Sequence, residues 1–351
     1  MAKEGVSSLG RSVVRRYVDS ISHRLVWLLI RMAPRLAGFA TAIFTKELAR
    51  APCNRVAEIV VPITTGGVRF TLLPSLPSGR FALTQCEVLV SPWSLYGSLS
   101  KSGEVYEPVM LACLTRLLQR TATPQFMDIG ACLGFYACYA SALFGGRQEV
   151  HAIESNPLYA NAIRESARVN GFSQLRVFQA ALSDQVEQVN IQGVTVRHEA
   201  HARDTTITLD DLCDREHLRP TIIKIDVHGA EGKIVRGMRD TLGEVECILL
   251  EMHNLPYMQE YSPGVTRTTM LDALEDAGLT LYYVAGHHAF FKKLATNFQE
   301  LLAGRGYSYR KLDRQARDLL LFDRREDEFV LALRHDDIES LLGPNVSPSN
   351  E

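Results

Sequence analysis

From Pro124 onward, the chain alternates between short apolar runs and stretches with apolar residues at helical spacing. Strand–helix alternation of this kind is typical of a parallel sheet that helices cover on both faces. We therefore predict an α/β domain over residues 121–340. The expected strands lie at residues 125–130, 149–155, 175–182, 221–226, 247–253 and 279–285, and the expected helices at residues 134–144, 157–170, 208–217, 230–240 and 267–278.

Two stretches of this domain depart from the simple alternation. Residues 186–199 alternate in polarity and turn at Gln192-Gly193, which predicts a hairpin. Further on, either residues 318–323 or residues 328–335 are expected to supply a closing edge strand. Residues 341–351 are polar, and we expect them to form a disordered tail.

The region before the domain divides into two parts. Residues 1–50 predict a basic amphipathic helical segment, with two helices that break near Pro34. Residues 51–120 predict a β-rich preamble, with a hairpin turning at Gly66-Gly67, and an entry helix. That helix is expected to start near Glu107-Pro108.

Composition and charge narrow the possible partners. Hydrophobic residues make up 46% of the chain, which is enough for a sizeable core, and the net charge of −2 gives no indication of nucleic-acid binding. Residues 1–50 hold nine Lys and Arg against three Asp and Glu, a local charge of +6. We expect this segment to pack in a homo-oligomer or on the domain, with peripheral membrane contact as the alternative.

Two further features bear on location. The apolar stretch at residues 25–44 contains two arginines and Pro34, which argue against a membrane-spanning helix. The seven cysteines are odd in number and include no C-x-x-C pair, so we expect thiols in a reducing compartment. We expect a cytoplasmic protein, with attachment to a membrane surface left open.

The stretch MDIGACLGFYA, residues 127–137, places two glycines between a buried strand and a helix. Gly130 is expected to let the chain turn sharply, and Gly134 to let the helix approach a ligand closely. The pattern D-x-G-x-x-x-G lacks the compact glycine cradle of a pyrophosphate site, which disfavours a dehydrogenase. We therefore expect a nucleoside-like ligand without a diphosphate.

An acidic residue at the end of the second strand sharpens this expectation. Glu154 follows the glycine turn by about 20 residues, the position from which a carboxylate accepts hydrogen bonds from ribose hydroxyls. Together with Asp128, it suits a ligand that carries both a ribose and an amino group. S-adenosyl-L-methionine has both.

Several short stretches then form a recognisable set. They are MDIGACLGFYA, HAIESNP, FQAALSD, TTITLDDL, IIKIDVHGAE and ILLEMHN. Residues 104–290 thereby resemble the FkbM family of S-adenosylmethionine-dependent methyltransferases. The resemblance implies a Rossmann-like class I methyltransferase fold with a seven-stranded, mostly parallel sheet, and methylation of a hydroxyl on a sugar or other natural-product scaffold.

The chain departs from the family pattern at two positions. Cys132 stands where the family usually has Asn, and His228 stands where it usually has Glu. The first change should be tolerable beside backbone contacts, whereas the second affects the presumed reaction centre. The residues predicted to bind the cofactor are Asp128, Gly130, Ala131, Cys132, Gly134, Glu154, Ser155, Asn156, Ala181 and Asp226.

Four polar residues are expected to meet at the ends of two neighbouring strands. Asp226 and His228 follow the fourth strand, and Glu251 and His253 close the fifth. The carboxyl ends of parallel strands share one edge of the sheet, so we predict that these four residues form the catalytic centre. Lys224, which shares a face with Asp226, is expected to form a structural ion pair.

Methyl transfer to a hydroxyl needs a group that takes the proton, because a neutral hydroxyl is a weak nucleophile. A histidine can act as this general base. The same four residues, Asp226, His228, Glu251 and His253, could instead hold a divalent metal, which is possible but not expected because no metal-specific spacing is present.

The acceptor is open beyond a small-molecule or glycan hydroxyl. Lys292 and Lys293 suit an anionic acceptor, although a solvated surface turn explains them at least as well. Trp93 and Tyr96 suit stacking on a sugar ring, but ordinary packing is the preferred interpretation. Two alternative functions remain. Besides the O-methyltransferase, the chain could be a catalytically inactive S-adenosylmethionine-binding scaffold or a membrane-associated assembly factor with a methyltransferase fold.

Overall fold

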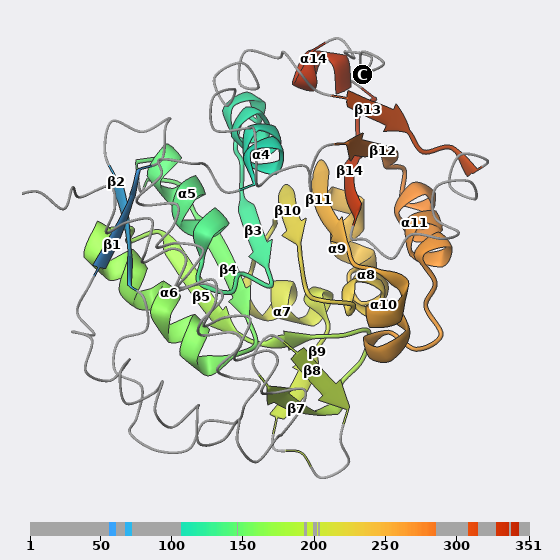
Figure 1. Cartoon of the computed structure of the whole chain (residues 1–351), viewed down its shortest axis with the longest axis horizontal. Helices are drawn as coiled ribbons and strands as arrows, with labels where there is room; N and C mark the ends of the chain where they lie inside the picture. The colour runs from blue at the N-terminus through green and yellow to red at the C-terminus, as the bar shows by residue number, and fades with distance from the viewer. Residues whose placement is uncertain are drawn as a thin grey trace, which may run out of the picture. The chain divides into compact units, whose positions relative to one another are not determined.

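A sheet of eight strands forms the core of the described α/β domain, in the order β13–β12–β14–β11–β10–β3–β4–β5 (Figure 1). The computed structural model describes residues 107–145, 147–192, 195–198, 202, 204–285, 308–314, 328–336 and 338–343, and the backbone of residues 56–60 and 67–71. The strands are β3 (Phe126–Ile129), β4 (Val150–Glu154), β5 (Leu175–Gln179), β10 (Ile222–Ile225), β11 (Cys247–Met252), β12 (Thr280–Ala285), β13 (Ser308–Lys311) and β14 (Glu328–Leu333).

The strand directions give a Rossmann-like class I methyltransferase sheet. Strands β5, β4, β3, β10 and β11 run parallel, and β14 runs antiparallel between β11 and β12. The predicted α/β class is confirmed. Eight strands replace the predicted seven because β13 adds an antiparallel strand beyond β12. The predicted closing strand at residues 328–335 is present as β14, but it lies inside the sheet and not at its edge.

The chain reverses direction across the sheet between β3 and β10. It passes from β3 outward through β4 to β5, and then returns to β10 on the other side of β3. Ligands of open α/β sheets bind beyond the carboxyl ends of the strands at such a reversal. The ends of β3, β4, β10 and β11 are therefore where a site is expected.

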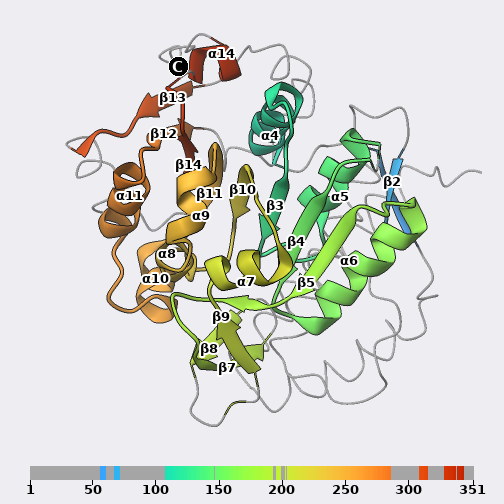
Figure 2. The same cartoon turned by 180° about the vertical axis from the view of Figure 1, so that it is seen from behind.

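Helices cover the sheet, and the views from both sides show α5 and α6 beside β3 to β5 and α8 to α11 beside β10 to β12 (Figures 1 and 2). Alternate strand residues such as Met127, Ile129, Ile223 and Ile225 face a buried apolar layer that includes side chains of α7, α8 and α11. The helices are α4 (Pro108–Arg120), α5 (Phe135–Leu143), α6 (Pro157–Asn170), α7 (Leu209–Glu216), α8 (Glu231–Arg236), α9 (Arg239–Glu244), α10 (Leu255–Tyr261), α11 (Arg267–Asp276) and α14 (Ile338–Leu342).

Local sequence signals set several of these boundaries. Pro157 opens α6, and Gly171 follows its end with φ of 72°. Thr208 caps α7 by accepting the backbone N–H of Asp211 at 3.0 Å. The predicted entry helix begins at Pro108, as expected, with Glu107 as its N-cap residue.

A second sheet has the order β6–β9–β7–β8, with β6 (Ala181–Leu182), β7 (Gln188–Gln192), β8 (Thr195–His198) and β9 (Asp204–Ile207). The predicted hairpin is confirmed as the antiparallel pair β7–β8. The predicted strand at residues 175–182 is divided, because β5 pairs with β4 whereas β6 pairs with β9. The sequence did not predict β9, α10 or β13.

The preamble and tail are described in part. The predicted first hairpin is confirmed as β1 (Val56–Val60) paired with β2 (Gly67–Thr71). Helix α14 extends to Leu342, and Leu341 and Leu342 are buried, so the predicted tail begins too early. The predictions for residues 1–50, Trp93, Tyr96, Lys292 and Lys293 fall outside the described residues.

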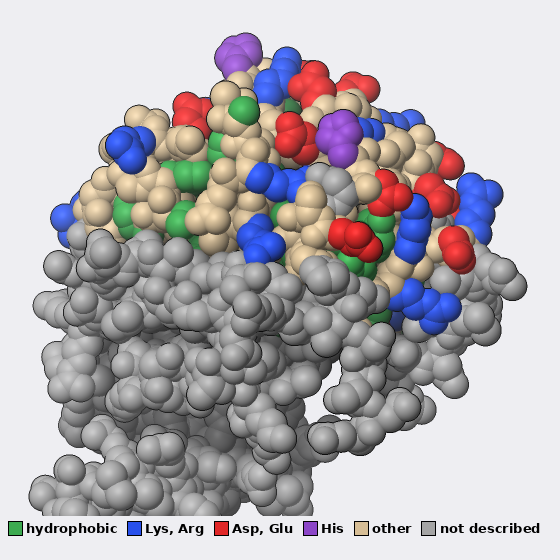
Figure 3. Space-filling view, turned by 90° about the horizontal axis from the view of Figure 1, so that it is seen from above, with side chains coloured by type: hydrophobic (Ala, Val, Ile, Leu, Met, Phe, Trp, Pro, Cys, Tyr) green, Lys and Arg blue, Asp and Glu red, His purple; other side chains and the backbone are tan. Residues whose placement is uncertain are grey.

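Two features of the described residues concern contact with other molecules and with membranes: the charges on one face, and the length and hydropathy of the helices. On the face shown in Figure 3, basic and acidic side chains are interspersed. None of the helices in the described part of the chain has the length and apolar character needed to cross a membrane.

Candidate active site

The turn after β3 depends on Gly130. This residue has φ of 78°, and an added Cβ would lie 1.8 Å from the backbone oxygen of Asp226. No side chain fits there, because the chain leaving β10 occupies the space. The predicted sharp turn is confirmed, and it brings the ends of β3 and β10 into contact.

Gly134 serves a different purpose from the one predicted. Its φ is 80°, but a Cβ at this position would meet the side chain of Ile163 on α6 at 2.9 Å. The glycine therefore lets α5 pack closely on α6, and the expectation that its missing side chain leaves space for a ligand is wrong. A contact between Gly134 and the cofactor stays a prediction.

Cys132 also adopts the left-handed backbone conformation, with φ of 50°. Asn tolerates this conformation better than most residues, which gives a physical reason for the residue that the FkbM pattern has here. The backbone N–H of Cys132 donates a hydrogen bond of 2.8 Å to Oε2 of Glu154. This contact uses the backbone of Cys132 and not its side chain. That a cysteine is tolerable at this position stays a prediction.

Glu154 joins the two loops that follow β3 and β4. Its buried carboxylate also accepts the backbone N–H of Asn156 at 2.7 Å. Burial raises the pKa of Glu154 to about 7, against the effect of the hydrogen bonds from Asn156 and Cys132. A carboxylate oxygen has two lone pairs, so both oxygens can accept further hydrogen bonds from ribose hydroxyls.

Asp128 is the second buried carboxylate at this edge. Its Oδ2 accepts the backbone N–H of Ala137 at 3.1 Å, whereas its buried Oδ1 has no hydrogen-bond partner among the described residues. Burial raises the pKa of Asp128 to about 6, and the charge of Lys224 opposes this rise. An orphaned buried acceptor of this kind fits a ligand amino group.

The remaining predicted cofactor residues lie around these carboxylates. Gly130 and Ala131 donate their backbone N–H groups to the oxygen of Ile153 on β4. Ala181 is buried in β6, and its neighbour Ala180 donates its backbone N–H to the oxygen of Glu154 at 3.1 Å. The predicted set thus lies on connected segments, and its contacts with a cofactor, including those of Ser155, stay predictions.

Lys224 and Asp226 form the predicted ion pair, with Nζ and Oδ2 2.9 Å apart. Lys224 is almost fully buried, and its ammonium lies 4.6 Å from the centre of the Tyr136 ring. Burial works to raise the pKa of Asp226, but Lys224, His253 and His228 hold it well below its usual range. Asp226 is therefore a carboxylate at neutral pH.

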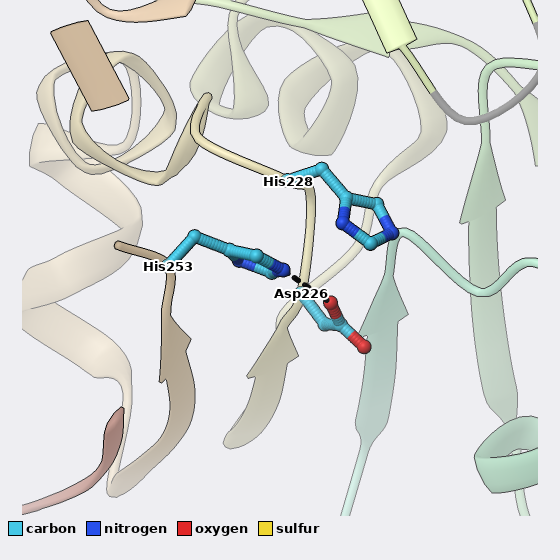
Figure 4. A group of neighbouring side chains, drawn as sticks. All are labelled: Asp226, His228 and His253. Carbon is cyan, nitrogen blue, oxygen red and sulfur yellow. Dashed lines mark ion pairs between the residues drawn. The ribbon is translucent and has the colours of Figure 1, made fainter. Parts of the chain in front are cut away.

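Three of the four predicted catalytic side chains converge beyond β10 and β11 (Figure 4). Nε2 of His253 lies 3.8 Å from Oδ1 of Asp226, and the rings of His228 and His253 are 4.6 Å apart. One possible ligand atom from each of these three residues lies within 4.8 Å of the others. Glu251 lies outside this group, although its charge contributes to the raised pKa of His253.

Glu231, which was not among the residues predicted from the sequence, holds His253 in place. Glu231 is fully buried at the start of α8, and its Oε1 lies 2.6 Å from Nδ1 of His253. Burial works to lower the pKa of His253, but the hydrogen bond and charge of Glu231 raise it to about 10. The available signal was its place in the stretch IIKIDVHGAE, just after the fourth strand.

The backbone of His253 has a second support that the sequence analysis missed. Arg267, buried at the start of α11, donates from Nε to the backbone oxygen of His253 at 3.1 Å. Arginine at a helix start is usually a surface residue, so nothing in the local pattern indicated this contact. Arg267 thereby fixes the end of β11.

The turn that carries His228 is held tightly against α10. His228 has φ of 51°, and Gly229 has φ of 102°. A Cβ at Gly229 would lie 2.5 Å from the oxygen of Tyr257, and Ser262 donates its hydroxyl to the oxygen of Gly229 at 2.6 Å. The packing of α10 against this turn holds His228 in its strained backbone conformation.

Comparison with known proteins gives the family. The family model for the methyltransferase FkbM domain matches residues 128–281, from β3 into β12. This part of the chain is a methyltransferase FkbM domain. The predicted resemblance is confirmed, and with it the class of S-adenosylmethionine-dependent methyltransferase. A search of curated proteins found no match.

Solved structures similar to the chain include several methyltransferases. Precorrin-6y C5,15-methyltransferase from Geobacter metallireducens is 16% identical with a TM-score of 0.33, over 64% of this chain and 86% of that one. The N-terminal domain of EvdMO1 with SAH bound is 11% identical with a TM-score of 0.35, over 66% and 83%. At these TM-scores the likenesses add nothing to the family match.

The FkbM domain contains both halves of the site. The match includes Asp128 and Glu154 on the cofactor side and Asp226, His228 and His253 beyond β10 and β11. We call the first group, with the turn at Gly130, the cofactor half. We call the second group, with Glu231, the reaction centre.

Proposed function

We propose that the FkbM domain transfers a methyl group from S-adenosylmethionine to a hydroxyl of a sugar or natural-product scaffold. The observation that carries this proposal is the histidine pair, His228 and His253, beside Asp226 at the switch point of the sheet. A hydroxyl must lose its proton during transfer, and imidazole is the side chain best suited to take it near neutral pH.

The cofactor half fits S-adenosylmethionine. The orphaned oxygen of Asp128 would accept from the amino group, and Glu154 would accept from the ribose hydroxyls. When bound, the cofactor supplies the methyl group that the acceptor oxygen attacks. The protein's own contribution is to hold the acceptor in line and to remove its proton.

Within the pair, His228 is the better placed proton acceptor. His253 is almost fully buried, and its Nδ1 is engaged by Glu231. His228 is half-buried on a turn at the edge of the sheet, so an acceptor hydroxyl reaches it more easily. We assign proton removal to His228, and orientation of the acceptor to His253 and Asp226.

An exposed aromatic side chain supports a sugar or polyhydroxyl acceptor. Tyr257 on α10 is 41% exposed, and its ring centre lies 6.4 Å from that of His228. Aromatic faces beside a polar site bind the apolar face of a ring-shaped ligand while its hydroxyls meet the polar groups. We therefore assign to Tyr257 a stacking contact with the acceptor ring, and the roles of Trp93 and Tyr96 stay predictions.

The test is methyl transfer with a panel of sugars and polyhydroxylated scaffolds, each paired with the analogue that lacks one hydroxyl. The expected product carries one methyl group on oxygen, and the matching deoxy analogue is not methylated. Methylation on nitrogen or carbon, or equal methylation of the deoxy analogue, would contradict the proposal.

The second candidate function is an inactive scaffold that binds S-adenosylmethionine. The observation that favours it is that His228 stands where the FkbM pattern has Glu. A scaffold binds the cofactor but forms no S-adenosylhomocysteine with any acceptor in the panel.

We further propose that residues 1–50 mediate homo-oligomer formation in the cytoplasm. Removing them should lower the mass in solution without abolishing cofactor binding, whereas loss of binding to anionic vesicles alone would indicate a membrane role.

A further inference from the structure

The reaction centre has the composition and spacing of a metal site. Asp226, His228 and His253 offer one carboxylate oxygen and two imidazole nitrogens, all within 4.8 Å of one another (Figure 4). A divalent transition metal holds such atoms about 2.0–2.2 Å from itself. Small side-chain rotations would therefore bring all three onto one ion.

The imidazole ring of His253 is oriented in the way that is typical of metal-binding histidines. A histidine that binds a metal through one nitrogen typically hydrogen-bonds a carboxylate or carbonyl through the other, which fixes the ring. Nδ1 of His253 lies 2.6 Å from the fully buried carboxylate of Glu231, and its Nε2 faces Asp226 (Figure 4). Glu231 itself is held by the backbone N–H of Gly229 at 3.0 Å.

The separation between His253 and Asp226 leaves room for an ion. Their facing atoms, Nε2 and Oδ1, are 3.8 Å apart, which is too far for a direct hydrogen bond. The other oxygen of Asp226 is bound by Lys224 at 2.9 Å, which fixes the carboxylate. The strained turn at His228 then places a second imidazole 4.6 Å from the first.

We propose that Asp226, His228 and His253 bind one divalent transition-metal ion, with Glu231 as the positioning residue. Two imidazoles and one carboxylate favour Zn²⁺, Fe²⁺, Co²⁺ or Mn²⁺ over Mg²⁺, which prefers oxygen ligands. Three protein ligands leave positions open for the acceptor hydroxyl. Bound there, the hydroxyl would have a lowered pKa and would release its proton to water, so His228 would serve as a ligand and not as the base.

The role of the ion in transfer rests on the proposed O-methyltransferase function, whereas binding of the ion does not. Binding is therefore measured without cofactor or acceptor. The purified full chain, freed of metal with a chelator, is titrated with Zn²⁺, Mn²⁺ and Mg²⁺ by calorimetry. Co²⁺ is added in a parallel experiment, because its visible absorption reports on nitrogen coordination.

Two histidines allow a matched comparison. His228 and His217 both have left-handed backbone, with φ of 51° and 57°, and Asn tolerates this conformation. His217 is exposed at the end of α7, away from the cluster. The variants His228→Asn and His217→Asn therefore differ in the site and not in backbone strain.

We expect the wild type and His217→Asn to bind one equivalent of Zn²⁺, with a much weaker response to Mg²⁺. His228→Asn should bind Zn²⁺ at least tenfold more weakly and lose the Co²⁺ absorption. Glu231→Gln should weaken binding about 10- to 100-fold while the Co²⁺ spectrum keeps its nitrogen character.

Three results would overturn the proposal. They are no metal binding by the folded wild type, unchanged binding by His228→Asn, and equal losses in His228→Asn and His217→Asn. Methyl transfer that survives the chelator in a wild type that binds no metal would overturn the metal site and leave the proposed methyltransferase function standing.

Discussion

At the ends of β3 and β4 the buried carboxylates are held by backbone N–H groups, whereas at the ends of β10 and β11 charged side chains hold one another. Glu154 accepts from Cys132 and Asn156, and these contacts need the correct turn more than particular side chains. In the reaction centre, Glu231 and Asp226 contact His253 through side chains. The cofactor half is thus specified by backbone shape, and the reaction centre by residue identity.

Two buried histidines show the same difference. His151 on β4 has no hydrogen-bond partner for either ring nitrogen among the described residues, and burial lowers its pKa to about 4. His253 is equally hidden from water, but Glu231 raises its pKa to about 10. Burial alone favours the neutral ring, and a buried carboxylate partner reverses that preference.

The largest expected effect is that of Gly130→Val, which breaks the backbone turn of the cofactor half. A Cβ there would overlap the oxygen of Asp226, and φ of 78° is unfavourable for valine. We expect loss of cofactor binding together with a large drop in thermal stability. Calorimetry with S-adenosylmethionine and a melting curve measure both.

Gly171→Ala is the matched control, because Gly171 has φ of 72° but nothing within 4 Å of an added Cβ. It should cost only about 1 kcal/mol of stability and leave cofactor binding unchanged. Similar losses in the two variants would mean that backbone strain, and not the contact with β10, explains the effect of Gly130→Val.

The second prediction concerns acid stability and His151. Its pKa is about 4 in the folded protein, whereas that of an unperturbed histidine is 6.5, so the unfolded chain binds more protons between these two pH values. The contribution of the neutral His151 ring to the free energy of unfolding is therefore fully present above about pH 6.5, and it is lost as the pH falls towards 4. The expected loss is about 3 kcal/mol.

His151→Leu should remove this part of the acid dependence in urea unfolding measured from pH 7 to pH 4. Arg176 and Glu149 are the charged groups near the ring, and both remain in the variant. An identical pH dependence in the variant and the wild type would show that His151 finds a partner when it is protonated.

The third prediction sharpens the role of Glu154 in the cofactor half. Glu154→Ala should weaken the binding of S-adenosylhomocysteine by about 1.5–3 kcal/mol, because hydrogen bonds to the ribose are lost. Glu154 also holds the Cys132 N–H, so the variant could weaken binding through the loop alone. The 2′-deoxy analogue separates the two effects.

The wild type should bind the deoxy analogue more weakly than S-adenosylhomocysteine, whereas Glu154→Ala should bind the two ligands almost equally. If the variant still discriminates between them as the wild type does, Glu154 does not contact the ribose.

The fourth prediction concerns the reaction centre. His228→Asn should lower turnover at least tenfold and leave cofactor affinity nearly unchanged, because proton removal and cofactor binding use different residues. Steady-state rates and calorimetry on the same preparation provide the two readouts. His217→Asn should match the wild type in both turnover and cofactor affinity. A similar loss of turnover in this control would mean that the effect of His228→Asn does not report on catalysis.

The sequence was informative where the local pattern decides the structure. Alternating apolar runs predicted the strands β3, β4, β10 and β11, and Pro157 and Gly171 predicted the ends of α6. Strands β9 and β13 were missed because both are mostly polar and lack a clear apolar pattern. The inner position of β14 depends on pairing with both β11 and β12, which no local pattern reports.

The same limit applies to the site. Asp128 lies in β3, Gly130 follows β3 directly and Glu154 ends β4, and all three belong to a recognisable motif, so their positions could be predicted. Glu231 and Arg267 act through contacts 22 and 14 residues away along the chain, which only the folded structure brings together. The need for a glycine at position 134 also comes from tertiary packing, because Ile163 on another helix fills the space beside it.

The central claim is that cofactor binding and methyl transfer depend on separate halves of one FkbM domain. Calorimetric titration of S-adenosylmethionine into the wild type, Glu154→Ala and His228→Asn tests it most directly. We predict one equivalent bound to the wild type, nearly the same affinity in His228→Asn, and about 10- to 150-fold weaker binding in Glu154→Ala. No binding by the wild type, or equal weakening in the two variants, would contradict the account.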